Sequence, residues 1–213
     1  VSNLHSMPTD CPQRDERQGW MGDGHLTVEE AAYNFDMAAF YTKWLADMEV
    51  AQAEDGSVPD CVPYHDFGGE VGTPAWQVAY PLTVWYMHKH YGDSRVLVAH
   101  YDSLVRWMDY MADLADDHIV EAGRGDWVPP QRTQPENQEE VYLTSTAYYY
   151  RSAQILADAA RMIGRTEDAE RYDALATEIR DAFNERFFDT GAGRYEPHSQ
   201  CSQAFPLDRK SVV

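Results

Sequence analysis

Apolar residues recur every three or four positions along most of this chain, which is the spacing of helices that bury one face. The pattern predicts five helices, over residues 26–53, 76–91, 94–116, 141–163 and 167–188. In the third of these, Leu97, Tyr101, Leu104 and Met108 fall on one face. Strand-like alternation of apolar and polar residues is rare. We therefore expect an all-α fold, in which a further helix begins after His198.

Local signals mark the ends of several predicted helices. Thr27 and Glu30 have the spacing of a capping box at the start of the first helix. Gly92 and Gly164 follow the second and fourth helices, where glycine commonly ends a helix in a left-handed conformation. Pro81 is expected either to begin the regular part of the second helix or to kink it, because proline has no amide hydrogen to donate.

Two long loops interrupt the helices, over residues 56–75 and 122–140. Loops of this length in compact domains are often functional, and these gather Trp, Asp, Glu, Arg and His. Helix hairpins stacked in a ring or in a solenoid both fit the pattern. No repeat recurs at a fixed period of about 33 to 47 residues, and its absence disfavours the solenoid.

The charge balance narrows the possible partners. The chain has 36 acidic and 17 basic residues, a formal net charge of −19. Such a surface repels phosphate backbones and anionic lipids, so we expect neither nucleic acid nor membrane as a partner, whereas neutral substrates remain compatible. The alternative is that most of these carboxylates only maintain solubility. The sequence assigns no cellular location.

The cysteine and histidine spacing gives no metal or cofactor signature. Cys11, Cys61 and Cys201 form an odd, sparse set, which we interpret as free thiols rather than as a disulfide framework. No CxxC pair or other metal-binding constellation is present in the sequence. We therefore expect no metal site and no cofactor.

The densest chemistry lies in residues 9–23, TDCPQRDERQGWMGD, which hold four carboxylates, two arginines and one tryptophan. Sugar hydrolysis requires this inventory: one carboxylic acid protonates the leaving oxygen, a second carboxylate activates water or attacks, and charged groups bind hydroxyls. A neighbouring arginine lowers a carboxyl pKa while a second carboxylate or burial raises it, so a mixed cluster can keep one acid protonated. From residue types alone, a structural ion-pair network is the favoured interpretation and a glycosidase is the alternative.

The order of residues in this segment resembles the signature of the bacterial α-L-rhamnosidases of glycoside hydrolase family 78. The resemblance continues through NFDMAAFYTKWLADMEVAQ, DGSVPDCVP, TPAW, HKHYGD, GDWVPP and TSTAYYY, and so covers nearly the whole chain. It implies an (α/α)6 six-hairpin barrel whose active site lies in the loops at one end. The activity it implies is that of an inverting exo-glycosidase which hydrolyses terminal non-reducing α-L-rhamnose from glycosides or polysaccharides.

The resemblance also assigns residue roles. Glu16 matches the general acid. Asp10 and Asp23 match carboxylates that bind rhamnose hydroxyls, and Trp20 matches an aromatic residue of the sugar pocket. The remaining substrate-binding candidates are Arg14 and Arg17, of which one is expected to orient a carboxylate, the later pocket tryptophans Trp76 and Trp127, and Asp126. For each tryptophan the alternative is ordinary core packing.

Two departures from the family pattern matter. Many relatives have an Asp two places after the tryptophan equivalent to Trp76, whereas this chain has Val78, so substrate preference is expected to differ. The family's general base is a Glu far beyond Val213. We expect residues 1–213 to be a partial six-hairpin catalytic domain, without its first helix and its C-terminal hairpins, and to be inactive alone. The expected partners are a rhamnose-containing carbohydrate and the remainder of the parent polypeptide.

Two other functional hypotheses remain open at this point. One is a catalytically incomplete fragment that acts only as a weak carbohydrate-binding or interaction module, which the missing base favours. The other is a different enzyme on the same barrel, such as a lyase, which would need a Tyr or His base in the loops. His65, His118 and His198 are available for that role, but none lies in a motif that supports it.

Overall fold

The protein is described here by a computed structural model, whose described residues are 4, 6–9, 17–64, 73–125 and 138–209. These residues form eight helices and four two-residue strands. The helices are α1 (Met21–Asn34), α2 (Ala38–Ala51), α3 (Pro74–Gln77), α4 (Ala79–Tyr91), α5 (Arg95–Asp113), α6 (Gln138–Met162), α7 (Thr166–Phe187) and α8 (Gln200–Arg209). The strands are β1 (Ala115–Asp116), β2 (Ile119–Val120), β3 (Phe188–Asp189) and β4 (Arg194–Tyr195).

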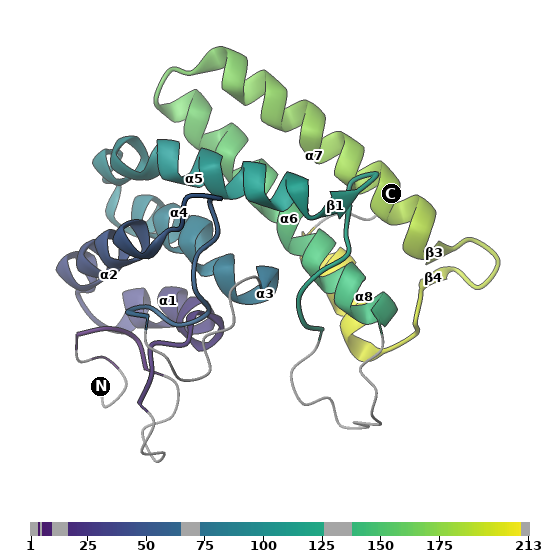
Figure 1. Cartoon of the computed structure of the whole chain (residues 1–213), viewed down its shortest axis with the longest axis horizontal. Coiled ribbons are helices and arrows are strands. Elements are labelled where there is room, and N and C mark those ends of the chain that lie inside the picture. Colours follow the sequence, from purple (N-terminus) through teal and green to yellow (C-terminus); the bar gives the residue numbers. More distant parts are fainter. Residues whose placement is uncertain (1–3, 5, 10–16, 65–72, 126–137, 210–213) are drawn as a thin grey trace.

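The longest helix, α6, packs against α3, α4, α5, α7 and α8, whereas α1 and α2 pack mainly against α4 (Figure 1). Every residue from Leu143 to Tyr150 is buried, because α6 is covered on more than one side. Its second half is rich in alanine, including Ala153, Ala157 and Ala160, and these small side chains allow α7 to lie close alongside in antiparallel orientation. The helix pair α6–α7 is therefore a tightly packed hairpin.

The prediction of an all-α fold is confirmed for the described residues. The prediction for residues 94–116 corresponds to α5, that for 141–163 to α6 and that for 167–188 to α7, with ends displaced by three residues at most. Gly92 and Gly164 end α4 and α6 with φ of 65° and 80°, as expected for left-handed stops. The sequence pattern also missed the small antiparallel pairs β1–β2 and β3–β4, which are too short for alternation to show.

The single helix predicted over residues 26–53 is wrong, since the structure has two helices there, α1 and α2. Phe35 adopts an extended conformation between them. The amide of Met37 donates to the Tyr91 hydroxyl at 2.8 Å, and the amide of Ala38 donates to Asp36 Oδ1 at 3.3 Å. The hydroxyl of Tyr91 from α4 and the carboxylate of Asp36 thus accept the amides at the break. Neither contact can be predicted from the spacing of apolar residues.

The capping box at Thr27 and Glu30 is also wrong, because α1 begins six residues before Thr27, at Met21. The Thr27 hydroxyl instead donates within the helix, to the carbonyl of Gly24 at 3.0 Å. The predicted helix 76–91 is likewise divided into the single turn α3 and the longer α4. Pro81 lies in the first turn of α4, where its missing amide hydrogen costs little, so of the two expectations the first is confirmed.

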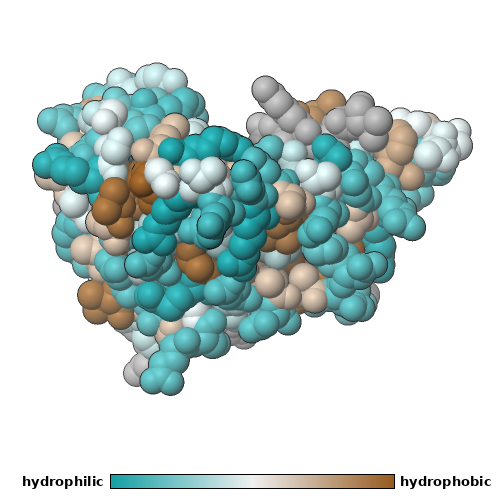
Figure 2. Space-filling view, turned by 90° about the horizontal axis from the view of Figure 1, so that it is seen from above, coloured by the Kyte–Doolittle hydropathy of each residue, from teal (hydrophilic) through white to brown (hydrophobic). Residues whose placement is uncertain are grey.

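The surface is predominantly hydrophilic on the face shown in Figure 2, where apolar side chains form separate small groups. Among the described residues, the large apolar side chains with most exposure are Val50, Leu26, Tyr33 and Leu207. No described helix is both long and apolar enough to span a lipid bilayer. Cys61 and Cys201, the described cysteines, are not joined in a disulfide bond, and Cys11 lies outside the described residues.

Gly56 gives a first testable prediction, because it has φ of +90° and a Cβ there would lie 2.2 Å from the carbonyl oxygen of Arg106. Gly56→Ala combines left-handed strain with a backbone collision. Gly164 has φ of +80° but no atom within 4 Å of a Cβ, so Gly164→Ala carries the strain alone. We expect Gly164→Ala to lower the free energy of unfolding by about 1–2 kcal/mol and Gly56→Ala by about 1–3 kcal/mol more. Urea denaturation measures both; equal losses would contradict the collision.

His100 gives a second prediction, on pH dependence. It is buried, and Tyr80 Oη lies 3.0 Å from its Nδ1. Burial lowers the pKa of His100 below its ordinary value of 6.5, although the charge of Glu49 acts in the opposite direction. The unfolded chain therefore takes up the proton first, so the stabilisation by neutral His100 is present above about pH 6.5 and declines as the pH falls below it.

We expect His100→Gln to remove part of the loss of stability between pH 7 and pH 5. The measurement is the free energy of unfolding at several pH values for both proteins. A variant whose stability falls as steeply as that of the wild type would show that another group carries the effect.

Candidate functional site

The segment before α1 is fixed by pairing with residues 60–62. The amide of Val62 donates to the carbonyl of Gly19 at 2.9 Å, and the amide of Met21 donates to the carbonyl of Asp60 at 2.8 Å. Trp20 and Cys61 form the antiparallel bridge between these two bonds. The pairing sets the direction in which the chain enters α1, and with it the position of the half-buried Trp20.

Three of the predicted site residues lie at this entrance. Trp20 immediately precedes α1, and its carbonyl accepts the amide of Gly24 at 2.9 Å, which closes the first helical turn. Asp23 lies in that turn and is exposed, at a helix end where the dipole favours a carboxylate. Arg17 is exposed and has a left-handed backbone, with φ of 47°. The three residues therefore border one helix N-terminus.

Trp76 reaches the same helix end from a distant part of the sequence. It is half-buried in α3, and its indole packs across the backbone of Gly22. A Cβ at Gly22 would lie 2.8 Å from the indole Nε1, closer than real Cβ contacts come. Gly22 thus provides the space that allows Trp76 to lie beside the turn that contains Asp23.

The helical turn α3 is held by side chains from three elements. Asp60 accepts two hydrogen bonds from Thr73, from its hydroxyl at 2.6 Å and from its amide at 3.3 Å. The buried His25 places Nε2 3.0 Å from the carbonyl oxygen of Ala75. The indole of Trp107 donates to Gln77 Oε1 at 3.1 Å. Thr73, Ala75 and Gln77 are therefore each tied to a neighbouring segment.

A third segment, residues 122–125, lies against α3 and the start of α6. The Ser145 hydroxyl donates to the carbonyl of Ala122 at 2.7 Å. Gly123 has φ of +103°, and a Cβ on it would lie 2.6 Å from Cδ of Pro74. Gly125 lies against the first turn of α6, near the Val141 amide. The segment 122–125 therefore packs against both α3 and the first turns of α6.

The structure therefore places Trp76 at the helix start that Trp20 and Asp23 occupy, and Arg17 lies in the segment that leads into it. Glu16, the predicted general acid, lies outside the described residues. So do four substrate-binding candidates, namely Asp10, Arg14, Asp126 and Trp127. Their roles remain predictions.

Asp60, Thr73 and His25 were not among the predicted site residues, although two of them lie in quoted motifs. Asp60 is in DGSVPDCVP and Thr73 is in TPAW. An acidic residue beside a cysteine between two prolines was a visible signal, but nothing in the sequence indicated its partner. Val78 is fully buried between α3 and α4, so it packs in the core rather than on the surface of the site.

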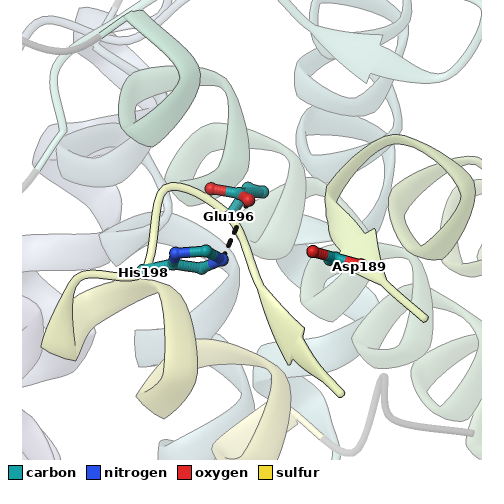
Figure 3. A group of neighbouring side chains, drawn as sticks. All are labelled: Asp189, Glu196 and His198. Atoms are coloured by element: carbon teal, nitrogen blue, oxygen red, sulfur yellow. Dashed lines mark ion pairs between the residues drawn. The ribbon is translucent and has the colours of Figure 1, made fainter. Parts of the chain in front are cut away.

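A second group of polar side chains, Asp189, Glu196 and His198, lies at the β3–β4 hairpin (Figure 3). Oδ1 of Asp189 accepts the amides of Gly191 and Ala192, and these bonds hold the pKa of that carboxyl below its ordinary value. His198 forms an ion pair with Glu196 at 2.8 Å. The three side chains therefore lie together because their contacts close the β3–β4 hairpin and the loop that follows it.

The histidines considered as alternative bases do not join the site among the described residues. His198 belongs to the hairpin group, and His118 Nε2 lies 3.8 Å from Glu178 of α7. His65 lies outside the described residues. The histidine that does contact the site region is His25, whose Nε2 is engaged with a backbone carbonyl and whose ring meets the edge of Tyr148.

Comparison with known proteins gives a consistent result. Residues 1–212 match the family model described as the bacterial alpha-L-rhamnosidase 6 hairpin glycosidase domain. An alpha-L-rhamnosidase of Formosa agariphila is 30% identical over 208 residues, which are 96% of this chain and 22% of that protein.

Two solved structures are similar over 99% of this chain. The alpha-L-rhamnosidase from Dictyoglumus thermophilum is 41% identical with a TM-score of 0.92, and 24% of that chain is covered. The alpha-L-rhamnosidase of Streptomyces avermitilis, solved with L-rhamnose, is 33% identical with a TM-score of 0.89, and 20% of it is covered. This chain thus spans about a fifth to a quarter of the length of these relatives, and its helices are part of a six-hairpin domain.

The packing of Trp76 on Gly22 yields a third prediction. Gly22→Ala places a methyl group where the indole lies, so the ring must move although alanine favours the helix by about 1 kcal/mol. We expect the fluorine resonance of Trp76 to shift in protein labelled with 5-fluorotryptophan, where Trp76→Phe identifies that resonance.

Leu26→Ala is the matched control, because Leu26 lies on the same helix and is 73% exposed. It should leave the Trp76 resonance in place. If Gly22→Ala also leaves the resonance unchanged, the indole does not pack on α1 as described.

Proposed function

The chain belongs to the family of the bacterial α-L-rhamnosidase six-hairpin glycosidase domain, and we propose on that basis that it forms part of an inverting exo-α-L-rhamnosidase. The observation that carries the proposal is that Trp76, from a distant part of the sequence, packs on the helix start that holds Trp20 and Asp23, within a chain that matches the family over residues 1–212. An apolar ring face beside an exposed carboxylate suits a deoxy sugar, which has both a methyl group and hydroxyls.

In this proposal Glu16 is the general acid that protonates the glycosidic oxygen as the bond to rhamnose breaks. A second carboxylate activates a water on the opposite face of the ring, which inverts the configuration at the anomeric carbon. Asp10 and Asp23 bind hydroxyls through charge-assisted hydrogen bonds. Trp20, Trp76 and Trp127 cover the apolar faces of the sugar.

The charged neighbours of Glu16 would set its protonation. An arginine lowers the pKa of a carboxyl that it contacts, whereas a neighbouring carboxylate raises that pKa. A general acid must be protonated when the substrate binds, so we expect an arginine to pair with a neighbouring carboxylate rather than with Glu16. Asp126 is the weakest of the binding candidates and would contact the sugar from beside Trp127.

We propose further that residues 1–213 act as part of a longer polypeptide, which supplies the general base and the remaining hairpins. The support is that the chain spans about a fifth of the length of its curated relatives. Residues 1–213 alone would then bind rhamnose weakly without hydrolysing its glycosides. This incomplete-module behaviour is the second candidate function, and the same fraction of length favours it.

The proposed partner is a neutral, rhamnose-containing carbohydrate. A formal net charge of −19 opposes binding to nucleic acid and to anionic membranes, whereas an uncharged sugar is indifferent to it. The proposal requires no cofactor and no metal ion, because both catalytic groups are carboxyls.

A fourth prediction tests the acid. In the longer polypeptide, Glu16→Gln should lower kcat for a rhamnosyl disaccharide by about 10²–10⁴-fold, the usual contribution of general acid catalysis. The loss should be much smaller for p-nitrophenyl α-L-rhamnoside, because p-nitrophenolate leaves without being protonated. Steady-state hydrolysis rates on both substrates measure this difference.

Asp15→Asn is the matched control, since it removes the adjacent carboxylate and should not reproduce the dependence on the leaving group. Residues 1–213 alone should show no turnover of either substrate. If this chain alone hydrolyses both substrates and Glu16→Gln leaves the rates unchanged, the assignment of the acid is wrong.

A further inference from the structure

Asp60 is a buried carboxylate, 3% exposed, outside the set of residues proposed to bind or hydrolyse the sugar. Burying a carboxylate is costly unless hydrogen bonds replace the lost water. Thr73 provides two of them, since its hydroxyl donates to Oδ2 at 2.6 Å and its amide donates to Oδ1 at 3.3 Å. Both oxygens of Asp60 are therefore directed at the residue that begins the turn carrying Trp76.

The hydroxyl of Thr73 is diverted from its usual role at a helix start. A threonine at the N-cap position commonly accepts an amide of the first helical turn through its side-chain oxygen. Thr73 occupies the N-cap of α3 but makes no such bond, and its hydroxyl donates to Asp60 instead. The orientation of α3 is thus fixed from outside the helix rather than by local capping.

Asp60 also contacts the other side of the site through its main chain. Its carbonyl oxygen accepts the amide of Met21 at 2.8 Å, at the first residue of α1. One residue therefore joins the start of α1, next to Trp20, to the start of α3, which carries Trp76. The two contacts use different groups, so a side-chain substitution breaks the link to α3 and leaves the link to α1.

We propose that Asp60 is a positioning residue, whose side chain fixes the distance between Trp76 and Trp20 and so sets the width of the sugar pocket. The inference rests on the proposed function for the identity of the ligand, but not for the position of Trp76. A four-residue turn cannot hold an indole in place by itself, because a single helical turn is unstable without tertiary contacts. Asp60 and Thr73 supply the contact at its start.

Substitutions at Thr73 separate the hydrogen bond from the bulk of the side chain. Thr73→Val removes the hydroxyl at nearly constant shape, whereas Thr73→Ser keeps the hydroxyl and removes a methyl group. In the longer polypeptide we expect Thr73→Val and Asp60→Asn each to raise KM for p-nitrophenyl α-L-rhamnoside by about tenfold with kcat changed less than about twofold. A tenfold change in affinity corresponds to about 1.4 kcal/mol, the size of one buried hydrogen bond. Thr73→Ser should stay within about twofold of the wild type in both constants.

Ser152→Ala is the control for a general loss of stability. The Ser152 hydroxyl is buried in α6 and donates to the carbonyl of Tyr148 at 2.8 Å, so its removal also deletes a buried hydrogen bond. We expect Ser152→Ala to lower the unfolding temperature by an amount comparable to Thr73→Val, without raising KM. A rise in KM for both variants would overturn the positioning role.

The fluorine resonance of Trp76 in 5-fluorotryptophan-labelled protein reads the position of the indole without reference to activity. Thr73→Val and Asp60→Asn should shift or broaden it, and Thr73→Ser and Ser152→Ala should not. If the wild-type polypeptide neither binds L-rhamnose nor hydrolyses its glycoside, the proposed function fails while this resonance still decides the role of Asp60. An unchanged resonance in Thr73→Val, or an equal shift in Thr73→Ser, overturns the proposal.

Discussion

The candidate site depends on the burial of α3, a helical turn of four residues that has no stability of its own. It is held by polar contacts at both ends, from Asp60 to Thr73 and from Trp107 to Gln77, and by His25 at the carbonyl of Ala75. These bonds are directional, so they determine how the turn is oriented, whereas apolar packing alone would tolerate several orientations. The position of Trp76 follows from that orientation.

The second part of the candidate site is the start of α1, where two glycines leave room for two tryptophan rings. Gly22 faces Trp76, and Gly24, two residues along α1, faces Trp44, where a Cβ would lie 2.4 Å from the ring. Glycine inside a helix costs about 1 kcal/mol relative to alanine, so two of them weaken α1 intrinsically. The buried area of a tryptophan and the hydrogen bond from Trp44 Nε1 to the carbonyl of Val62 at 3.1 Å offset that cost. The first turn of α1 is therefore stabilised by its neighbours.

Sequence patterns predicted the parts of this protein whose structure is local. The bodies of α5, α6 and α7 follow the spacing of apolar residues, and Gly92 and Gly164 end helices as expected. The break near Phe35 was missed because an apolar residue continues the pattern there, while the break depends on a hydroxyl 54 residues away from Met37. The start of α1 was missed because glycines were interpreted as loop residues, whereas the rings packed on them supply the helix with its stability.

The candidate site was predictable only in part for the same reason. Trp20, Asp23 and Trp76 could be named from motifs, but their meeting point depends on contacts between residues 13 and 50 positions apart, which no local pattern encodes. The sequence around Asp60 was distinctive, but nothing in it indicated that Thr73 would be its partner.

Val78 stands where many relatives have an Asp, and its burial in this fold changes how that difference is interpreted. The resemblance leads one to expect a carboxylate there, and its loss suggested an altered substrate preference. Val78 is instead fully buried at the junction of α3 and α4, within the core that includes Tyr80 and Leu82. A carboxylate at such a place would need buried donors, as Asp60 needs Thr73. With valine there, the junction is held by apolar packing, and the polar anchoring of α3 comes from Asp60 at its N-cap, Thr73, and from Trp107 at Gln77.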